Sequence, residues 1–81
     1  MIKAILTTEK ALRLLENENT LTILVDKSVT KPMIKQYFEK MGYKVKKVNT
    51  LNIEKGLKKA YVKFEKENAA KEILDKFGGL I

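Results

Sequence analysis

The sequence predicts an α+β fold, in which an antiparallel or mixed sheet of three or four strands packs against helices in an α/β sandwich. Segments whose apolar residues alternate with a period of two are interspersed with segments that have the helical period of 3.6. Two strand-like segments, 43–53 and 57–64, are separated by a short turn, which is typical of a hairpin. The 81 residues, 44% of them hydrophobic, suit a single domain, 1–81, with a thin core.

The first third of the chain provides a strand, a helix and a second strand. Residues 2–6 are mostly apolar and partly β-branched, which favours a short strand. Thr8 is suited to cap a helix that runs to about Asn17, because its hydroxyl can accept a hydrogen bond from the first turn. Residues 20–26 alternate apolar and polar side chains, and Leu24 indicates that both faces of this strand are partly covered.

A second helix begins after Thr30, its predicted N-cap, and ends at Gly42. Pro32 is tolerated in the first turn, where its missing N–H would have no helical partner. The apolar stripe of this helix comprises Ile34, Tyr37, Phe38 and Met41.

The hairpin comes next. In strand 43–53 the apolar side chains change parity between Val45 and Val48, which predicts a bulge near Lys46–Lys47. Lys55-Gly56 supplies the turn. The returning strand points Ala60, Val62 and Phe64 inward and Lys59, Tyr61 and Lys63 outward.

The last helix begins after Asn68, its predicted N-cap, and stops at Gly78 and Gly79. Its apolar face consists of Ile73, Leu74 and Phe77. The predicted order of elements is (β)αβαββα, in which helices connect strands along the chain and pack against the sheet that the strands form.

Charge is distributed unevenly along the chain, whose net charge is +7. Residues 27–63 contain eleven lysines and only two acidic residues, Glu39 and Glu54, which gives a net charge of +9. The flanking segments 1–26 and 64–81 each contain three basic and four acidic residues, a net charge of −1. A basic middle between slightly acidic ends predicts a polyanionic partner on one surface, and the alternative is a lysine-rich surface that serves solubility alone.

The residue types that most catalytic and metal sites need are missing. The chain contains no cysteine and no histidine, which removes thiolate nucleophiles, imidazole bases and the usual zinc ligands. Its one arginine, Arg13, lies on a predicted helix and not in the anion-binding loop that an acyl-phosphate hydrolase would need. We therefore expect no enzyme, no metal and no cofactor. No apolar run approaches the roughly 20 residues of a membrane span, so a cytoplasmic protein is expected.

The outward face of the hairpin is suited to RNA. Lys59 and Lys63 can neutralise phosphates while the Tyr61 ring between them stacks on a base. An equally good interpretation is that Tyr61 covers sheet surface under a helix. Asn49 and Thr50 add hydrogen-bonding groups to the basic stretch, and a bulge or strand end is the alternative explanation for them.

Five stretches of the chain resemble, in order, a known family. They are TEKA at 8–11, LTILVD at 21–26, TKPMIKQYFE at 30–39, VKKVNTL at 45–51 and GLKKAYVKF at 56–64. Together they are similar to the universal large-subunit ribosomal protein of the polypeptide tunnel exit, number twenty-three in its series. The shortness of the chain resembles the archaeal members.

The resemblance implies a structural, non-catalytic ribosomal component that binds large-subunit rRNA beside ribosomal protein number twenty-nine, at the rim where nascent chains emerge. Many bacterial members carry a long loop between the last two strands that reaches the tunnel. Here that connection is only about residues 52–57, so contacts with the tunnel wall are not implied.

The resemblance also implies site residues, at two helix starts and in the hairpin. With the lysines of the same basic stretch, the predicted RNA-binding residues are Thr8, Lys10, Thr30, Lys31, Lys35, Lys46, Lys47, Asn49, Thr50, Lys55, Lys58, Lys59, Tyr61 and Lys63. Glu9 matches an acidic position on which bacterial relatives dock a ribosome-bound chaperone, so a signal recognition particle or a nascent-chain chaperone is an implied partner. The alternative role of Glu9 is to complement the helix dipole.

Two other functions remain open on the sequence. One is a free-standing basic module that binds RNA or DNA, which would show no preference for one rRNA region. The other is a small phosphate-ester or acyl-phosphate hydrolase, which an activity screen would reveal.

Overall fold

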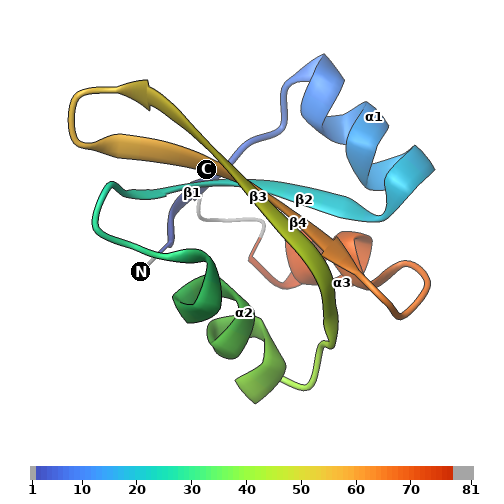
Figure 1. The fold of residues 1–81 in the computed structure, drawn as a ribbon. Helices are drawn as coiled ribbons and strands as arrows, with labels where there is room; N and C mark the ends of the chain where they lie inside the picture. Colours follow the sequence, from blue (N-terminus) through green and yellow to red (C-terminus); the bar gives the residue numbers. More distant parts are fainter. Residues whose placement is uncertain (1, 78–81) are drawn as a thin grey trace.

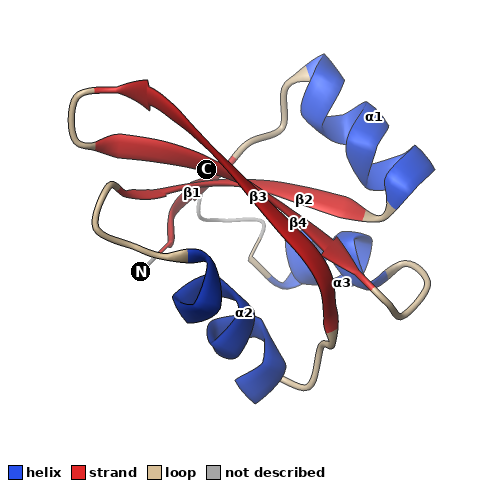
Figure 2. Ribbon diagram, in the orientation of Figure 1, coloured by secondary structure: helices blue, strands red, loops and turns tan. Residues whose placement is uncertain are grey.

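A computed structural model describes residues 2–77 and has the predicted order of elements, β-α-β-α-β-β-α (Figure 1, Figure 2). The elements are β1 (Ile2–Ile5), α1 (Glu9–Glu18), β2 (Thr20–Asp26), α2 (Lys31–Lys40), β3 (Val45–Glu54), β4 (Leu57–Phe64) and α3 (Ala69–Lys76). The predicted α+β class is confirmed. Gly78 and Gly79, the predicted end of the last helix, lie outside the described residues.

The four strands form one sheet in the order β1-β2-β4-β3, and each pair of neighbours is antiparallel. The sequence predicted an antiparallel or mixed sheet of three or four strands, and the sheet is antiparallel with four strands. The β3–β4 hairpin turns at Lys55-Gly56 as expected, and Gly56 adopts a φ of +84°, a conformation that only glycine takes without strain. β3 is an edge strand, whereas β4 lies inside the sheet between β2 and β3.

The hydrophobic core lies between the sheet and the helices α2 and α3, which pack on the same side of it (Figure 1). All three side chains predicted to point inward from β4 are at most 2% exposed. They meet Leu21 and Ile23 of β2, Phe38 of α2 and Ile73 of α3. A fully buried Val, Leu, Ile or Phe side chain contributes about 1.5–3 kcal/mol by leaving water, so this face of the sheet is committed to the core.

α1 packs along the edge of β2. β1 pairs with the later part of β2, between Ile23 and Val25, so the edge beside Thr20 is left for the helix. From this position α1 contributes to both sides of the sheet: Leu15 joins the core, while the half-buried Leu14 faces the opposite side. The helix therefore forms a wall beside the second face and does not cover it.

The bulge predicted in β3 is present. Val45 pairs with Phe64, but the next pair is Lys47 with Lys63, so Lys46 is the extra residue. Before the bulge Val45 points into the core, and after it Val48 does so. Without the shift, Val48 and the charged residues beside it would exchange faces.

The predicted N-cap positions of α1, α2 and α3 are confirmed, and at the first two the side chain also caps the helix. The amide of Ala11 donates to Thr8 Oγ1 at 3.2 Å, and the equivalent bond to Thr30 Oγ1 is 3.4 Å long. Asn68 occupies the N-cap position of α3, but with a φ of 62° its side chain makes no capping hydrogen bond. Asn19 supplies the acceptor instead, because the amide of Ala70 donates to its Oδ1 at 3.0 Å.

Candidate nucleic-acid interface

The second face of the sheet is an array of polar and basic side chains on three adjacent strands, β2, β4 and β3. Residues directly opposite each other in the register form rows across these strands. The rows are Thr20, Lys63 and Lys47; then Thr22, Tyr61 and Asn49; then Leu24, Lys59 and Leu51. We call these nine residues the basic face. The predicted outward orientation of Lys59, Tyr61 and Lys63 is confirmed by this register.

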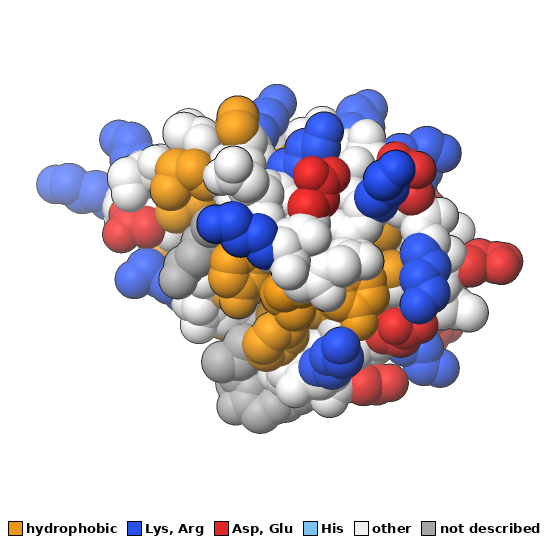
Figure 3. Space-filling model, turned by 90° about the horizontal axis from the view of Figure 1, so that it is seen from below, with side chains coloured by type: hydrophobic (Ala, Val, Ile, Leu, Met, Phe, Trp, Pro, Cys, Tyr) orange, Lys and Arg blue, Asp and Glu red, His pale blue; other side chains and the backbone are white. Residues whose placement is uncertain are grey.

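Exposure increases across the basic face from β2 to β3. Thr20 and Thr22 are 6% and 3% exposed beside α1, whereas Lys47 and Asn49 on the edge strand are exposed. The β4 side chains between them are half-buried. The opposite side of the molecule differs in charge pattern, since lysine and acidic side chains are intermixed around apolar patches there (Figure 3).

Within residues 2–77, the lysines of the basic middle segment form no ion pairs. Within residues 2–77, the ion pairs are Arg13 with Glu9 and Lys66 with Glu72, at 3.4 and 3.5 Å. All four of these residues lie outside 27–63. The net charge of +9 in that segment is therefore not neutralised by close contact with any carboxylate of the described chain.

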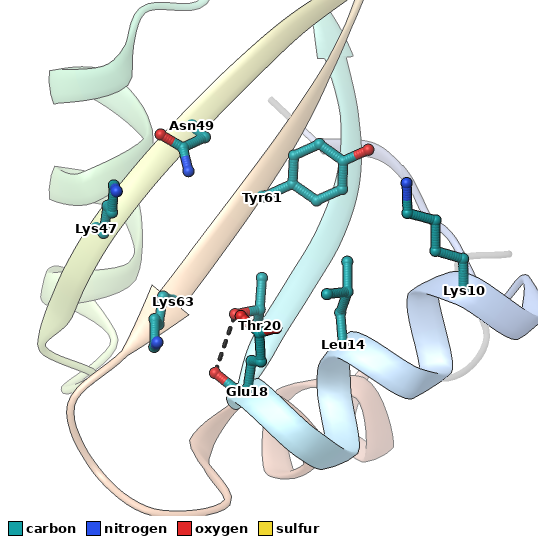
Figure 4. A pocket seen from close by; sticks show the side chains of 8 residues that line it. All are labelled: Lys10, Leu14, Glu18, Thr20, Lys47, Asn49, Tyr61 and Lys63. Carbon is teal, nitrogen blue, oxygen red and sulfur yellow. Dashed lines mark hydrogen bonds between the residues drawn. The ribbon is translucent and has the colours of Figure 1, made fainter.

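A hollow of about 390 Å³ opens between α1 and the basic face (Figure 4). Its sides come from α1 and from the hairpin, and the ring of Tyr61 extends across it with the hydroxyl toward Lys10. The lining residues are Lys10, Leu14, Glu18, Thr20, Lys47, Asn49, Tyr61 and Lys63. Five of them were predicted from the sequence as RNA-binding residues. We call this hollow the Tyr61 groove.

Four lining residues were missed by the sequence-based prediction, namely Leu14, Glu18, Thr20 and Thr22, the last of which lines a smaller adjoining hollow. The alternation of β2 places both threonines on its polar face. That they stand beside Lys63 and Tyr61 depends on the pairing of β2 with β4, two strands that no hairpin connects.

A second basic hollow, of about 440 Å³, lies between the start of α2 and the start of β3. Lys31 and Lys35 lie one helical turn apart on α2 and face Lys46 at the bulge. Lys47 lines this hollow as well as the Tyr61 groove. The exposed edge strand β3 therefore connects the two basic hollows into one surface.

The other predicted RNA-binding residues lie elsewhere. Thr8 lines the smaller hollow next to Tyr61, and Thr30 is exposed at the start of α2. Lys55 is exposed in the hairpin turn. Lys58 and Thr50 have the opposite parity from Tyr61 and point to the core side, where Lys58 Nζ donates to the backbone oxygen of Val29 at 2.8 Å.

Glu9, the predicted docking residue, is exposed in the first turn of α1. Its contact with Arg13 spans 3.4 Å between side chains that are 90% and 68% exposed. Such surface pairs stabilise a protein by a few tenths of a kcal/mol at most, so Glu9 remains accessible to a partner.

Neither a metal centre nor a membrane-spanning helix occurs in the part of the chain that the structure describes. Residues 2–77 bring no three histidine, cysteine or acidic side chains together in a group that could hold a metal ion. Over the same residues, the helices are too short and too polar to cross a bilayer. The side chains of the basic face present ammonium groups, an aromatic ring and an amide.

Comparison with known proteins identifies the class. The family model described as ribosomal protein L23 matches residues 1–74. The chain is 62% identical over 76 residues to the large ribosomal subunit protein uL23 of Nanoarchaeum equitans, covering 94% of this chain and 97% of that protein. It is 52% identical to the same protein of Pyrobaculum aerophilum, covering 99% and 100%, and 43% identical to that of Tetrahymena thermophila, covering 96% and 53%.

The chain is therefore a structural ribosomal protein and not an enzyme. It belongs to the ribosomal protein L23 family, whose members include archaeal proteins of almost the same length. The resemblance noted in the sequence is thereby confirmed.

Proposed function

We propose that this protein is a constituent of the large ribosomal subunit that binds the rRNA of that subunit through the basic face and the adjoining hollow at α2. Its relatives are named as large-subunit proteins, which supports the location in the ribosome. The observation that carries the proposal is the unpaired state of the lysines in residues 27–63, within the described chain.

Phosphate groups are suited to neutralise these lysines. A lysine that neutralises a phosphate releases a condensed counterion, which provides most of the affinity of a protein for an RNA backbone. Lysine acts as a mobile point charge in such contacts and needs no fixed geometry. Tyr61 and Asn49 lie among these lysines and can contact bases where the RNA is not paired.

Within the subunit, we propose a position at the rim of the polypeptide exit tunnel beside ribosomal protein number twenty-nine. The short β3–β4 hairpin favours a position at the rim over contact with the tunnel wall, because its turn consists only of Lys55-Gly56. The two strands extend from the body of the molecule at that end (Figure 1). Ile53, which is 41% exposed there, is available to a neighbouring protein.

We propose Glu9 as part of a docking surface for a signal recognition particle or a nascent-chain chaperone. Its full exposure at the start of α1 supports this role. The variant E9K should weaken factor docking to assembled subunits while leaving rRNA binding unchanged, and E16K, at the other end of α1, is the matched control. Unchanged docking in E9K would leave Glu9 only its favourable interaction with the helix dipole.

A binding titration tests the rRNA proposal. Fragments of large-subunit rRNA are titrated against the wild type, the variant K47Q/K59Q/K63Q and the control K27Q/K44Q/K71Q, which loses the same charge at exposed lysines outside the Tyr61 groove. One fragment should bind far more tightly than the rest, and only the basic-face variant should lose that preference. Equal binding of all fragments would contradict the proposal and favour a general RNA- or DNA-binding module.

A further inference from the structure

A buried hydroxyl next to Tyr61 has no hydrogen-bond partner among the described residues. Thr22 is 3% exposed, and its Oγ1 is paired with no atom of the described chain. The neighbouring Thr20, which is also buried, donates from its Oγ1 to the backbone oxygen of Glu18 at 3.0 Å. Buried polar groups are nearly always paired, and an unpaired one destabilises the fold by about 1–3 kcal/mol. The hydroxyl of Thr22 is therefore available for a hydrogen bond to a bound molecule.

Thr22 lies in the small hollow beside the Tyr61 groove. It pairs directly with Tyr61 in the register of β2 and β4. Both residues line a small hollow of about 20 Å³, which shares Lys10, Leu14 and Tyr61 with the larger hollow of about 390 Å³. The small hollow therefore adjoins the Tyr61 groove at these shared side chains, and we call it the narrow end of the groove.

The groove has the chemistry of a nucleotide site. The Tyr61 ring, across from the apolar side chain of Leu14, offers a surface on which a base can stack (Figure 4). Lys10 and Lys63 bring ammonium groups to its rim, and the Asn49 amide can donate to and accept from a base edge. The narrow end has room for one hydroxyl group or one water, but not for a base.

We propose that the Tyr61 groove binds a single unstacked ribonucleotide. Its base stacks on Tyr61, its phosphate lies against the lysines of the rim, and its 2′-hydroxyl satisfies Thr22 Oγ1 directly or through one water. The proposal rests on the proposed rRNA binding and adds two properties to it. The groove selects unpaired over double-stranded RNA, and it selects RNA over DNA, since the 2′-hydroxyl is the group that distinguishes them.

Three probes test these properties separately. They are an oligouridylate of about eight nucleotides, its deoxyuridine counterpart, which lacks only the 2′-hydroxyls, and a blunt RNA duplex of about 16 base pairs. The chain contains no tryptophan, so the indole of the variant Y61W reports on this groove alone. The oligouridylate should quench that fluorescence, whereas the duplex should bind through the lysines without quenching it.

Two further variants divide the contributions. Y61L should weaken the oligouridylate by about 5- to 150-fold, the loss expected from one stacked base, and leave duplex binding unchanged. T22V should bind the ribo- and deoxyribo-oligomers equally, while its free form melts at a higher temperature because the unpaired hydroxyl is gone. The control T7V, at an exposed threonine outside the basic face and outside both hollows, should keep the preference for RNA and leave the melting temperature nearly unchanged.

The outcomes also separate this proposal from the one on which it rests. If the wild type binds large-subunit rRNA through the basic face, but Y61L and T22V change nothing, the nucleotide site is overturned and rRNA binding stands. A preference for RNA that T22V retains would overturn the role of Thr22. If neither rRNA nor the oligouridylate binds, the proposed function itself fails.

Discussion

Lys47 of β3 stands directly opposite Lys63 of β4 in the register of the hairpin, and neither forms an ion pair with a carboxylate of residues 2–77. Like charges at directly opposed positions of an antiparallel pair destabilise the sheet. The pair borders the Tyr61 groove, where Lys10 adds a third ammonium group. The sheet therefore keeps an unfavourable charge arrangement at the place that we assign to RNA.

Reversing one charge of this pair should stabilise the free protein and impair its function. In K63E the new carboxylate faces Lys47, so we expect the free energy of unfolding to rise by roughly 0.5–1 kcal/mol, which urea denaturation measures. Affinity for RNA should fall at the same time. A variant that is both less stable and unchanged in RNA binding would contradict our description of the basic face.

Salt should stabilise the free protein. At about 1 M sodium chloride the Debye length is roughly 3 Å, so repulsion among the lysines of the basic face is largely screened. If screening restores about 1 kcal/mol, the melting temperature rises by about 4–8 °C for a chain of this size. K47Q/K63Q should show a smaller rise in calorimetry, and equal melting of the wild type in low and high salt would show that repulsion is negligible.

Asn19 should matter far more than Asn68 for stability. Its side chain accepts from Ala70 and donates to the backbone oxygens of Phe64 and Lys66, at 3.1 and 2.6 Å, so it joins α1, β4 and α3. Both asparagines have positive φ, and glycine suits both backbones. N19G should therefore lower the free energy of unfolding by about 2–3 kcal/mol, from three lost hydrogen bonds, while N68G should leave it equal or higher.

Chemical denaturation of the two glycine variants checks this difference. Equal losses in N19G and N68G would show that the backbone conformation, and not the side-chain hydrogen bonds of Asn19, holds the start of α3. RNA binding should be unchanged in both variants, because neither residue belongs to the basic face.

Lys58 and Lys59 are adjacent in sequence and should have different roles. Lys58 Nζ donates to the backbone oxygen of Val29, whereas Lys59 lies on the basic face between Leu24 and Leu51. K58M should lower the free energy of unfolding by about 1–2 kcal/mol and change RNA affinity little. K59M should lower the affinity for RNA and change the free energy of unfolding little. Urea denaturation and RNA titration of both variants measure these two quantities.

Local patterns predicted much of this fold. The alternation of β4 gave the outward set that contains Tyr61, the parity change between Val45 and Val48 gave the bulge, and the threonines before two helices gave their caps. These features depend on neighbours within a few residues, and their physical causes are visible in the sequence. The hairpin turn at Lys55-Gly56 is of the same kind.

The long-range features could not be predicted. The capping of Ala70 by Asn19 joins residues 51 positions apart, and the contact of Lys58 with Val29 spans 29. The position of Thr22 beside Tyr61 depends on the register of β2 and β4, which is set by how their inward side chains pack and not by a turn. The groove against α1 likewise arises only when the helix takes its place along the edge of β2.

The salt dependence of binding tests the central claim, that RNA phosphates neutralise the lysines of the basic face. Affinity for the tightest rRNA fragment is measured over a range of salt concentrations for the wild type, K47Q/K59Q/K63Q and the control K27Q/K44Q/K71Q. Each phosphate contact contributes roughly 0.7–0.9 to the slope of log K against log salt. We predict that the basic-face variant loses about two units of slope and the control almost none. Equal losses in the two variants would contradict the claim, because only net charge would then matter.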